Sequence, residues 1–196
     1  MMKQTEITVQ IFEEAEELAG KLKNNKFELV GRYRLVDYYF SKYNTITLKN
    51  MSYADIIKNS FLVRECDGDA SIVYKNKEID KYNNVISETK KRLKITDNQV
   101  AKEVFLSAGL NNWCNLVQDM YYYKNNEMKI IVQHIDDLGI FIEYEEDASV
   151  ANLETEQKFE AMAEKLKSIG LKMGTNFSVK KAYEKFIKDL RNDSNT

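Results

Sequence analysis

The chain has 196 residues, of which 43% are hydrophobic, and this length supports one good core rather than two. Its 29 basic and 31 acidic residues give a net charge of −2, which excludes a global electrostatic attraction to nucleic acid or to an anionic membrane. The two cysteines lack metal-ligand spacing, and we find neither a signal peptide nor an apolar run of spanning length. We therefore expect a single cytoplasmic domain over residues 1–196, with a frayed tail at 191–196 and no nucleic-acid or membrane partner.

Strands and helices alternate in the first half of the chain. Ser52 is a candidate helix N-cap, and Asp67 with Gly68 suits a tight turn between two β-rich runs, which is the clearest hairpin signal in the sequence. The predicted elements are, in order, strand 4–11, helix 12–25, strand 26–40, helix 52–60 and the hairpin strands 60–66 and 70–77.

The second half continues with strands and ends in helices. Thr96 or Asp97 caps the central helix of this half, and Gly109 ends it. The predicted elements are strand 84–95, helix 96–110, strands 113–123, 128–135 and 138–147, and amphipathic helices at about 154–169 and 178–190. About eight strands in hairpins favour an antiparallel barrel, because closure removes exposed sheet edges.

Charged and polar residues share one face of several predicted strands, since side chains alternate with a period of two. The opposite faces are apolar, as in Ile7 and Val9. We therefore predict an α+β fold, an antiparallel eight-stranded β-barrel that forms a tunnel with flanking helices, with the apolar faces packed outward under the helices. The inward sets are Glu6 with Thr8 and Gln10, Leu62 with Arg64, Val73 with Lys75, Glu88 with Lys90 and Arg92, and Glu143 with Glu145.

The strand "LGIFIEYEED" (138–147) places two carboxylates, Glu143 and Glu145, on one face. Because these groups repel each other, they must face solvent, a basic side chain of the protein or a metal ion. The basic residues also have ordinary alternatives: Arg64 could pair with Glu65 or Asp67 at the surface, and the run 90–94 could be a solvated face.

Four motifs occur in the order typical of a known family. They are "DYYF" (37–40), "FLVRECDGDASIVYK" (61–75), "LGIFIEYE" (138–145) and "FSVKKAYEKFI" (177–187). Together they resemble the CYTH family, the triphosphate tunnel metalloenzymes that include class IV adenylyl cyclases, thiamine triphosphatases and inorganic triphosphatases. The resemblance covers about residues 3–190.

This resemblance implies a function and a set of site residues. The implied function is metal-dependent binding and hydrolysis, or cyclisation, of a triphosphate such as tripolyphosphate, thiamine triphosphate or ATP, with the oligomeric state, including a homodimer, left open. No catalytic residue is assigned. The implied phosphate-binding residues are Arg64, Lys75, Lys90 and Arg92, and the implied ligands of Mg²⁺ or Mn²⁺ are Glu6, Glu143 and Glu145.

The chain departs from the family pattern at several inward positions. Thr8 and Gln10 stand where a second Glu and a Lys are usual, and Gln133 stands where an Asp is usual. Leu62 and Val73 also replace the usual Arg and Thr, and residues 114–123 bring no basic side chain. The alternative function is therefore a catalytically weak CYTH-like domain that binds an anionic ligand or a protein partner.

Overall fold

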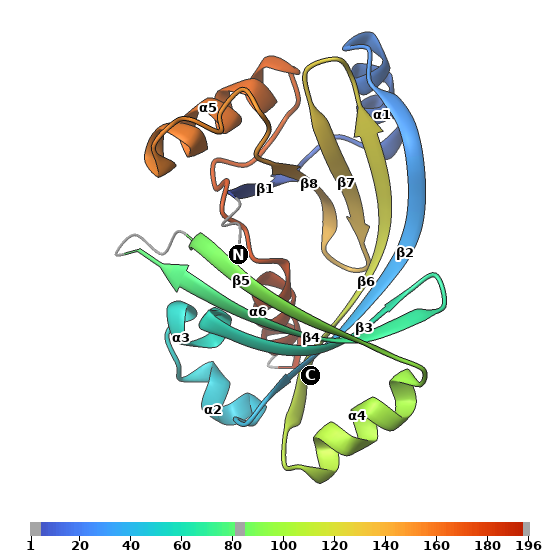
Figure 1. Ribbon diagram of the computed structural model, residues 1–196, viewed down its shortest axis with the longest axis vertical. Helices are drawn as coiled ribbons and strands as arrows, with labels where there is room; N and C mark the ends of the chain where they lie inside the picture. The colour runs from blue at the N-terminus through green and yellow to red at the C-terminus, as the bar shows by residue number, and fades with distance from the viewer. Residues whose placement is uncertain (1–4, 81–84, 194–196) are drawn as a thin grey trace. The chain divides into compact units, whose positions relative to one another are not determined.

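The computed structural model describes residues 5–80 and 85–193. The predicted strand starts at residues 4 and 84 lie outside the described residues, as do residues 194–196 of the predicted tail, whereas Arg191–Asp193 belong to the last helix. The elements follow one another in this order (Figure 1): β1 (Glu6–Ile11), α1 (Ala15–Asn24), β2 (Glu28–Ser41), α2 (Thr45–Lys49), α3 (Tyr53–Lys58), β3 (Asn59–Cys66), β4 (Asp69–Ile79), β5 (Val85–Ile95), α4 (Asn98–Ser107), β6 (Asn111–Lys124), β7 (Lys129–Ile135), β8 (Gly139–Glu145), α5 (Thr155–Ser168) and α6 (Lys181–Asp193).

The eight strands form one sheet in the order β1-β8-β7-β6-β2-β3-β4-β5. The strand pairs β1–β8, β2–β3, β3–β4, β4–β5 and β7–β8 are antiparallel. The predicted fold class, α+β with eight antiparallel strands and flanking helices, is confirmed. The short helix α2 was not predicted from the sequence, because five residues are too few to show a helical period.

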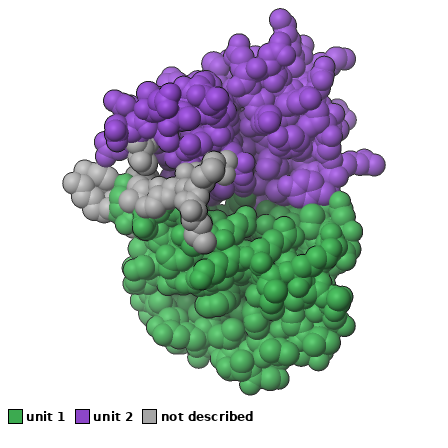
Figure 2. Space-filling view, viewed as in Figure 1, with its two compact units in different colours: residues 1, 34–118, 180–196 green, residues 2–33, 119–179 purple. Residues whose placement is uncertain are grey.

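The chain divides into two compact units, shown in different colours in Figure 2. The first unit contains residues 34–118 and 180–196, and the second contains 2–33 and 119–179, as far as these residues are described. Strands β2 and β6 contribute residues to both units. The expectation of a single domain stays a prediction.

The core of the second unit lies beneath helices α1 and α5. The apolar faces of β1, β7 and β8 pack against both helices, as the alternation predicts, so the polar residues of these strands point to the other face. The fully buried residues of this core include Ile7, Val9, Ile130, Ile142, Tyr144, Met162 and Leu166.

The apolar clusters of the first unit include two that lie under its helices. Helix α4 covers Phe40 and Val63 with its Ala101, and helices α2, α3 and α6 share a second cluster around Phe186. The predicted hairpin is also confirmed, because the turn between β3 and β4 consists of Asp67 and Gly68, which have φ of 48° and 88°.

Residues 171–179 pair with strand β1, and this contact was not predicted from the sequence. The amide of Thr8 donates to the Phe177 carbonyl (2.9 Å), and the amide of Phe12 donates to the Lys172 carbonyl (2.8 Å). These bonds satisfy backbone groups along β1 that an uncovered edge strand would expose. They also hold Glu6 in a strand of fixed register against β8.

A buried carboxylate, Glu13, joins the start of α1 to this same segment. Its side chain is fully buried, and its Oε1 accepts hydrogen bonds from Lys21 Nζ (2.7 Å) and from the amide of Lys172. Burial by itself raises the pKa of Glu13, but the hydrogen bonds from Lys21 and Lys172 outweigh it, so the pKa lies below its usual range.

We predict that Glu13→Gln lowers the free energy of unfolding by about 1–3 kcal/mol, the scale of a hydrogen bond to a charged group. Because the folded pKa is depressed, the contribution of Glu13 is present above the unfolded pKa, near 4.5, and is lost as the pH falls through the folded value. Urea unfolding from pH 7 to pH 3 measures both effects.

The matched control is Glu17→Gln, because Glu17 pairs with the same Lys21 (3.3 Å) but is 45% exposed. We expect it to cost less than about 1 kcal/mol. Equal costs for the two variants would contradict the role assigned to Glu13.

Candidate functional site

The three predicted metal ligands come together in the second unit, and we call Glu6, Glu143 and Glu145 the acidic cluster. Glu6 is the direct cross-strand partner of Glu145, and Glu143 lies on the same face of β8 two residues earlier. One carboxylate oxygen of each residue lies within 4.8 Å of the others. A third acidic residue, on β1, therefore lies beside the two carboxylates of β8.

The local packing of β8 forces its glutamates onto this face. Ile142 and Tyr144 are both 0% exposed and lie in the core with α1 and α5, so the alternating residues must point the other way. The hydroxyl of Tyr144 donates to Asp147, directly after the strand. This hydrogen bond fixes the end of the strand on which Glu143 and Glu145 sit.

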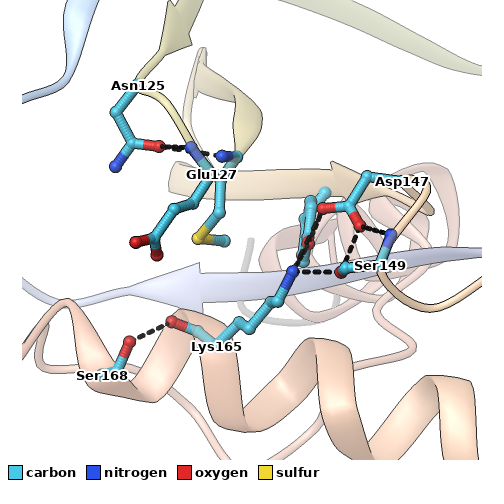
Figure 3. A network of polar contacts seen from close by, with 8 residues as sticks. Asn125, Glu127, Asp147, Ser149, Lys165 and Ser168 are labelled. Atoms are coloured by element: carbon cyan, nitrogen blue, oxygen red, sulfur yellow. Dashed lines mark hydrogen bonds and ion pairs between the residues drawn. The ribbon is translucent and has the colours of Figure 1, made fainter.

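Lys165 of α5 also binds the residues at the end of β8, as Figure 3 shows. Lys165 Nζ lies 3.3 Å from both Asp147 Oδ2 and Tyr144 Oη, and it also donates to Ser149 Oγ. Burial alone would raise the pKa of Asp147, but hydrogen bonds from Ser149, Tyr144 and Lys165 lower it to about 2. Asp147 is thus a paired carboxylate with a structural role.

Gln133 on β7 contacts the acidic cluster and was not predicted as a site residue. Its Nε2 donates to Glu143 Oε2 at 2.8 Å, and the residue is 0% exposed. The sequence marks Gln133 as a departure from the family pattern, but only the strand register reveals its partner. Gln133 pairs with Phe141 across β7 and β8, so Glu143 is its diagonal neighbour on the same face.

Glu143 and Glu145 line a cavity of about 400 Å³ in the second unit. Its wall also includes Tyr122, Glu127 and Lys129 from the β6–β7 hairpin. The turn of this hairpin is fixed by Asn125, whose Oδ1 accepts from the amides of residues 127 and 128 at 2.9 and 2.8 Å (Figure 3). A small polar ligand or a cation can therefore reach two members of the acidic cluster from this cavity.

The acidic cluster suits a hard divalent cation. Mg²⁺ and Mn²⁺ prefer carboxylate oxygen ligands, and two ligands on opposite sides of Mg²⁺ lie about 4 Å apart. Oxygens that already lie within 4.8 Å of one another need only small side-chain rotations to reach this spacing. The donor chemistry of Glu6, Glu143 and Glu145 therefore fits the metals that the sequence motifs imply.

The four predicted phosphate ligands lie in the first unit, and Arg64 has a different partner from those expected. It forms a bidentate ion pair with Asp37 of the neighbouring strand β2, with Nε–Oδ1 and Nη2–Oδ2 distances of 2.7 and 2.6 Å. The partner that the structure gives Arg64 is thus Asp37, which was not among the two acids, Glu65 and Asp67, that the sequence suggested. Two guanidinium nitrogens donate to one carboxylate, which is a strong geometry for such a pair, and Asp37 is only 1% exposed.

Lys75 and Lys90 are cross-strand partners on β4 and β5. Lys75 Nζ lies 3.4 Å from Glu88 Oε1, and Lys77, which the sequence reading missed, lies 3.7 Å from Glu88 Oε2. Burial would raise the pKa of Glu88, but the surrounding lysines, led by Lys75 and Lys77, lower it. Glu88 thus partly neutralises the positive charge of this strand pair.

Arg92 completes the predicted set and donates from Nε to Ser71 Oγ at 3.0 Å. We call Arg64, Lys75, Lys90 and Arg92 the basic face of the first unit. Lys90, Arg92 and Lys94 are all exposed, as the alternative of a solvated face predicts. Lys94, at the end of the same run, pairs with Asp69 (2.8 Å) in an exposed ion pair.

Comparison with known proteins supports the resemblance drawn from the motifs. No protein-family profile matches the chain. The chain is 25% identical over 172 residues to "Putative adenylate cyclase MJ0240" of Methanocaldococcus jannaschii, a match that covers 87% of the chain and 91% of the relative.

The fold of the chain resembles those of solved structures over nearly its whole length. The PH1819 protein of Pyrococcus horikoshii has a TM-score of 0.65 at 16% identity, covering 95% of this chain and 100% of that one. HpAC1 of Hippeastrum, a "Putative adenylyl cyclase" with a dominant triphosphatase activity, has a TM-score of 0.58 at 11% identity, with 96% of each chain covered. The chain therefore has the fold of these proteins, and the predicted resemblance to the CYTH family is confirmed. No helix within residues 5–80 and 85–193 is long and apolar enough to cross a membrane.

We predict that Glu6→Gln stabilises the metal-free protein. Glu6 faces Glu145 directly across β1 and β8, and like charges at such positions destabilise a sheet by about 0.2–1 kcal/mol. In EDTA the melting temperature should therefore rise, by roughly 0.5–4 °C for a chain of this size. Saturating Mn²⁺ should reverse the order, because wild type keeps all three carboxylates.

The control for this experiment is Glu146→Gln on the neighbouring residue. Glu146 accepts hydrogen bonds from the amide of Thr5 (2.9 Å) and from Lys158 Nζ (3.3 Å), so its replacement should lower the melting temperature with or without Mn²⁺. If Glu6→Gln behaves like Glu146→Gln, the acidic cluster is an ordinary solvated strand end.

We further predict that Asp37→Asn lowers the free energy of unfolding by about 3–5 kcal/mol, because it leaves Arg64 without its paired carboxylate in a buried setting. Asp69→Asn, which breaks the exposed pair with Lys94, should leave stability close to that of wild type, because solvent screens that pair. Chemical denaturation of the two variants, repeated in 1 M NaCl, tests the difference. A cost for Asp37→Asn as small as that for Asp69→Asn would overturn it.

Proposed function

We propose that the protein binds a triphosphate together with Mg²⁺ or Mn²⁺ and catalyses phosphoryl or nucleotidyl transfer from it. The observation that carries this proposal is the convergence of Glu6, Glu143 and Glu145, whose carboxylate oxygens lie within 4.8 Å of one another. Repulsion among three neighbouring carboxylates is unfavourable for folding, and a bound divalent cation would relieve it.

Relatives support the choice of substrate class. The M. jannaschii relative is a "Putative adenylate cyclase", and the Hippeastrum protein has a dominant triphosphatase activity. Both activities act on triphosphates, so a triphosphate is the substrate class that the two descriptions share. Tripolyphosphate, thiamine triphosphate and ATP are the candidates.

The acidic cluster would hold the divalent cation. When bound, the cation neutralises phosphate charge and polarises the phosphorus–oxygen bonds that react. The chain's own contribution there is to orient carboxylate oxygens in advance, which Glu143 does through its hydrogen bond from Gln133. Preorganised ligands of this kind need little rearrangement when the substrate binds.

The basic face would bind phosphate oxygens. Lys75 and Lys90 are adjacent across two strands, and Arg92 follows Lys90 on the same face of β5. Charge-assisted hydrogen bonds from such groups are worth about twice a neutral one. Arg64 contributes mainly as a charge held by Asp37, since two of its nitrogens already donate to that carboxylate.

A weakly catalytic binding protein is the second candidate, and one contact favours it. Gln10, which stands where the family has a Lys, has its Nε2 3.5 Å from the Leu138 carbonyl. The position of a usual cation is thus occupied by a neutral amide directed at the backbone. This alternative retains triphosphate binding and lacks turnover.

The deciding experiment measures binding and turnover separately. Tripolyphosphate, thiamine triphosphate and ATP are each incubated with Mg²⁺ or Mn²⁺, and phosphate, pyrophosphate and cyclic nucleotide are quantified. We expect turnover of at least one substrate, and Glu143→Gln should abolish it while metal-free binding of tripolyphosphate persists. Lys75→Ala should weaken tripolyphosphate binding about ten- to a hundredfold, the effect of losing one charge-assisted hydrogen bond.

Lys91→Ala is the matched control for Lys75→Ala. Lys91 is exposed and alternates with Lys90, so it lies on the opposite face of β5. We expect it to leave tripolyphosphate affinity within about twofold of wild type, because its side chain points away from the basic face. Binding without any turnover would establish the second candidate, and failure to bind any of the three ligands would refute both.

A further inference from the structure

We infer that Gln133 is a positioning residue that orients Glu143 for cation binding. The inference rests on the proposed function and adds to it a side chain that restrains the direction of a proposed metal ligand. It is carried by the contact between Gln133 Nε2 and Glu143 Oε2 at 2.8 Å and by the complete burial of Gln133.

The geometry of the sheet places Gln133 within reach of the Glu143 carboxylate. Gln133 and Glu143 are diagonal neighbours on one face of the β7–β8 pair, a separation that two long side chains can bridge. Phe141, the direct partner of Gln133, is 1% exposed, and Gln133 itself is 0% exposed, so the amide lies in a buried part of this face. The donor therefore restrains the direction of the Glu143 carboxylate within the acidic cluster.

The chemistry of the amide suits this role better than a carboxylate would. An amide nitrogen donates a hydrogen bond at every pH, whereas a carboxylate donates only when it is protonated. An acidic residue at position 133 would add a fourth negative charge beside Glu143 and repel it. Gln133 thus orients Glu143 without adding to the repulsion within the acidic cluster.

Groups that orient metal ligands have measurable effects on affinity. Removal of such a partner usually weakens metal binding about ten- to a hundredfold. Gln133→Leu removes the donor while it keeps most of the side-chain volume, so the effect on packing is small. We therefore expect the Kd for Mn²⁺, measured by titration without phosphate, to rise about tenfold in Gln133→Leu.

A double-mutant cycle separates orientation from a general structural effect. In the Glu143→Gln background, Gln133→Leu should change the Kd for Mn²⁺ by less than about twofold, because the carboxylate that Gln133 orients is gone. In the Glu145→Gln background, the full tenfold effect should remain, because Glu143 is still present. Metal-free affinity for tripolyphosphate should stay within about twofold of wild type in Gln133→Leu.

The remaining outcomes distinguish a failure of the positioning role from a failure of the proposed function. An unchanged Kd for Mn²⁺ in Gln133→Leu, or the same rise in all backgrounds, overturns the positioning role while leaving the proposed function intact. Absence of Mn²⁺ binding by wild type, by contrast, refutes the metal site and the positioning role together. A loss of tripolyphosphate binding in Gln133→Leu would also overturn the inference, because it would indicate a change in the fold.

Discussion

The burial of Tyr144 and Ile142 under α5 is the constraint on which the candidate metal site depends. In a strand, a residue that is buried on one face sends its neighbours to the other, so two fully buried side chains fix the direction of Glu143 and Glu145. The hydroxyl of Tyr144 adds a second restraint, because it binds Asp147, which Lys165 also holds. Apolar packing therefore provides the free energy that keeps like charges together, and neither glutamate needs to contribute to stability.

Cross-strand pairing explains how much charge this face can carry. Glu6 and Glu145 already form one like-charge pair, and a Glu at position 8 would form another with Glu143, its direct partner. Thr8 removes that second pair at the cost of one possible metal ligand. In the first unit positive charges repel one another, and Asp37 and Glu88 neutralise part of this basic face. Each charged face thus has a limited net charge, which favours a stable fold.

Most elements and the faces of the strands could be predicted from the sequence, but the short helix α2 and the polar partners could not. Period-two alternation located the strands, the paired positions of Glu143 and Glu145, and the hairpin turn at Asp67 and Gly68, because these signals lie within a few residues of one another. The Asp37–Arg64 ion pair, the Gln133–Glu143 hydrogen bond and the pairing of 171–179 with β1 join residues that are distant in the chain. Their identification requires the strand register, which a single sequence does not contain.

The departures from the family pattern acquire a common physical meaning once the register is known. Thr8 and Gln133 both lie close to Glu143 in the sheet, the first directly opposite it and the second diagonal to it. Both are neutral where the family has an acid, so Glu143 experiences less repulsion here and is oriented by a donor. Fewer carboxylates attract a cation less strongly, but they also repel one another less. The two neutral residues therefore remove possible metal ligands and, by the same change, lower the repulsion that the folded chain must hold in place around Glu143.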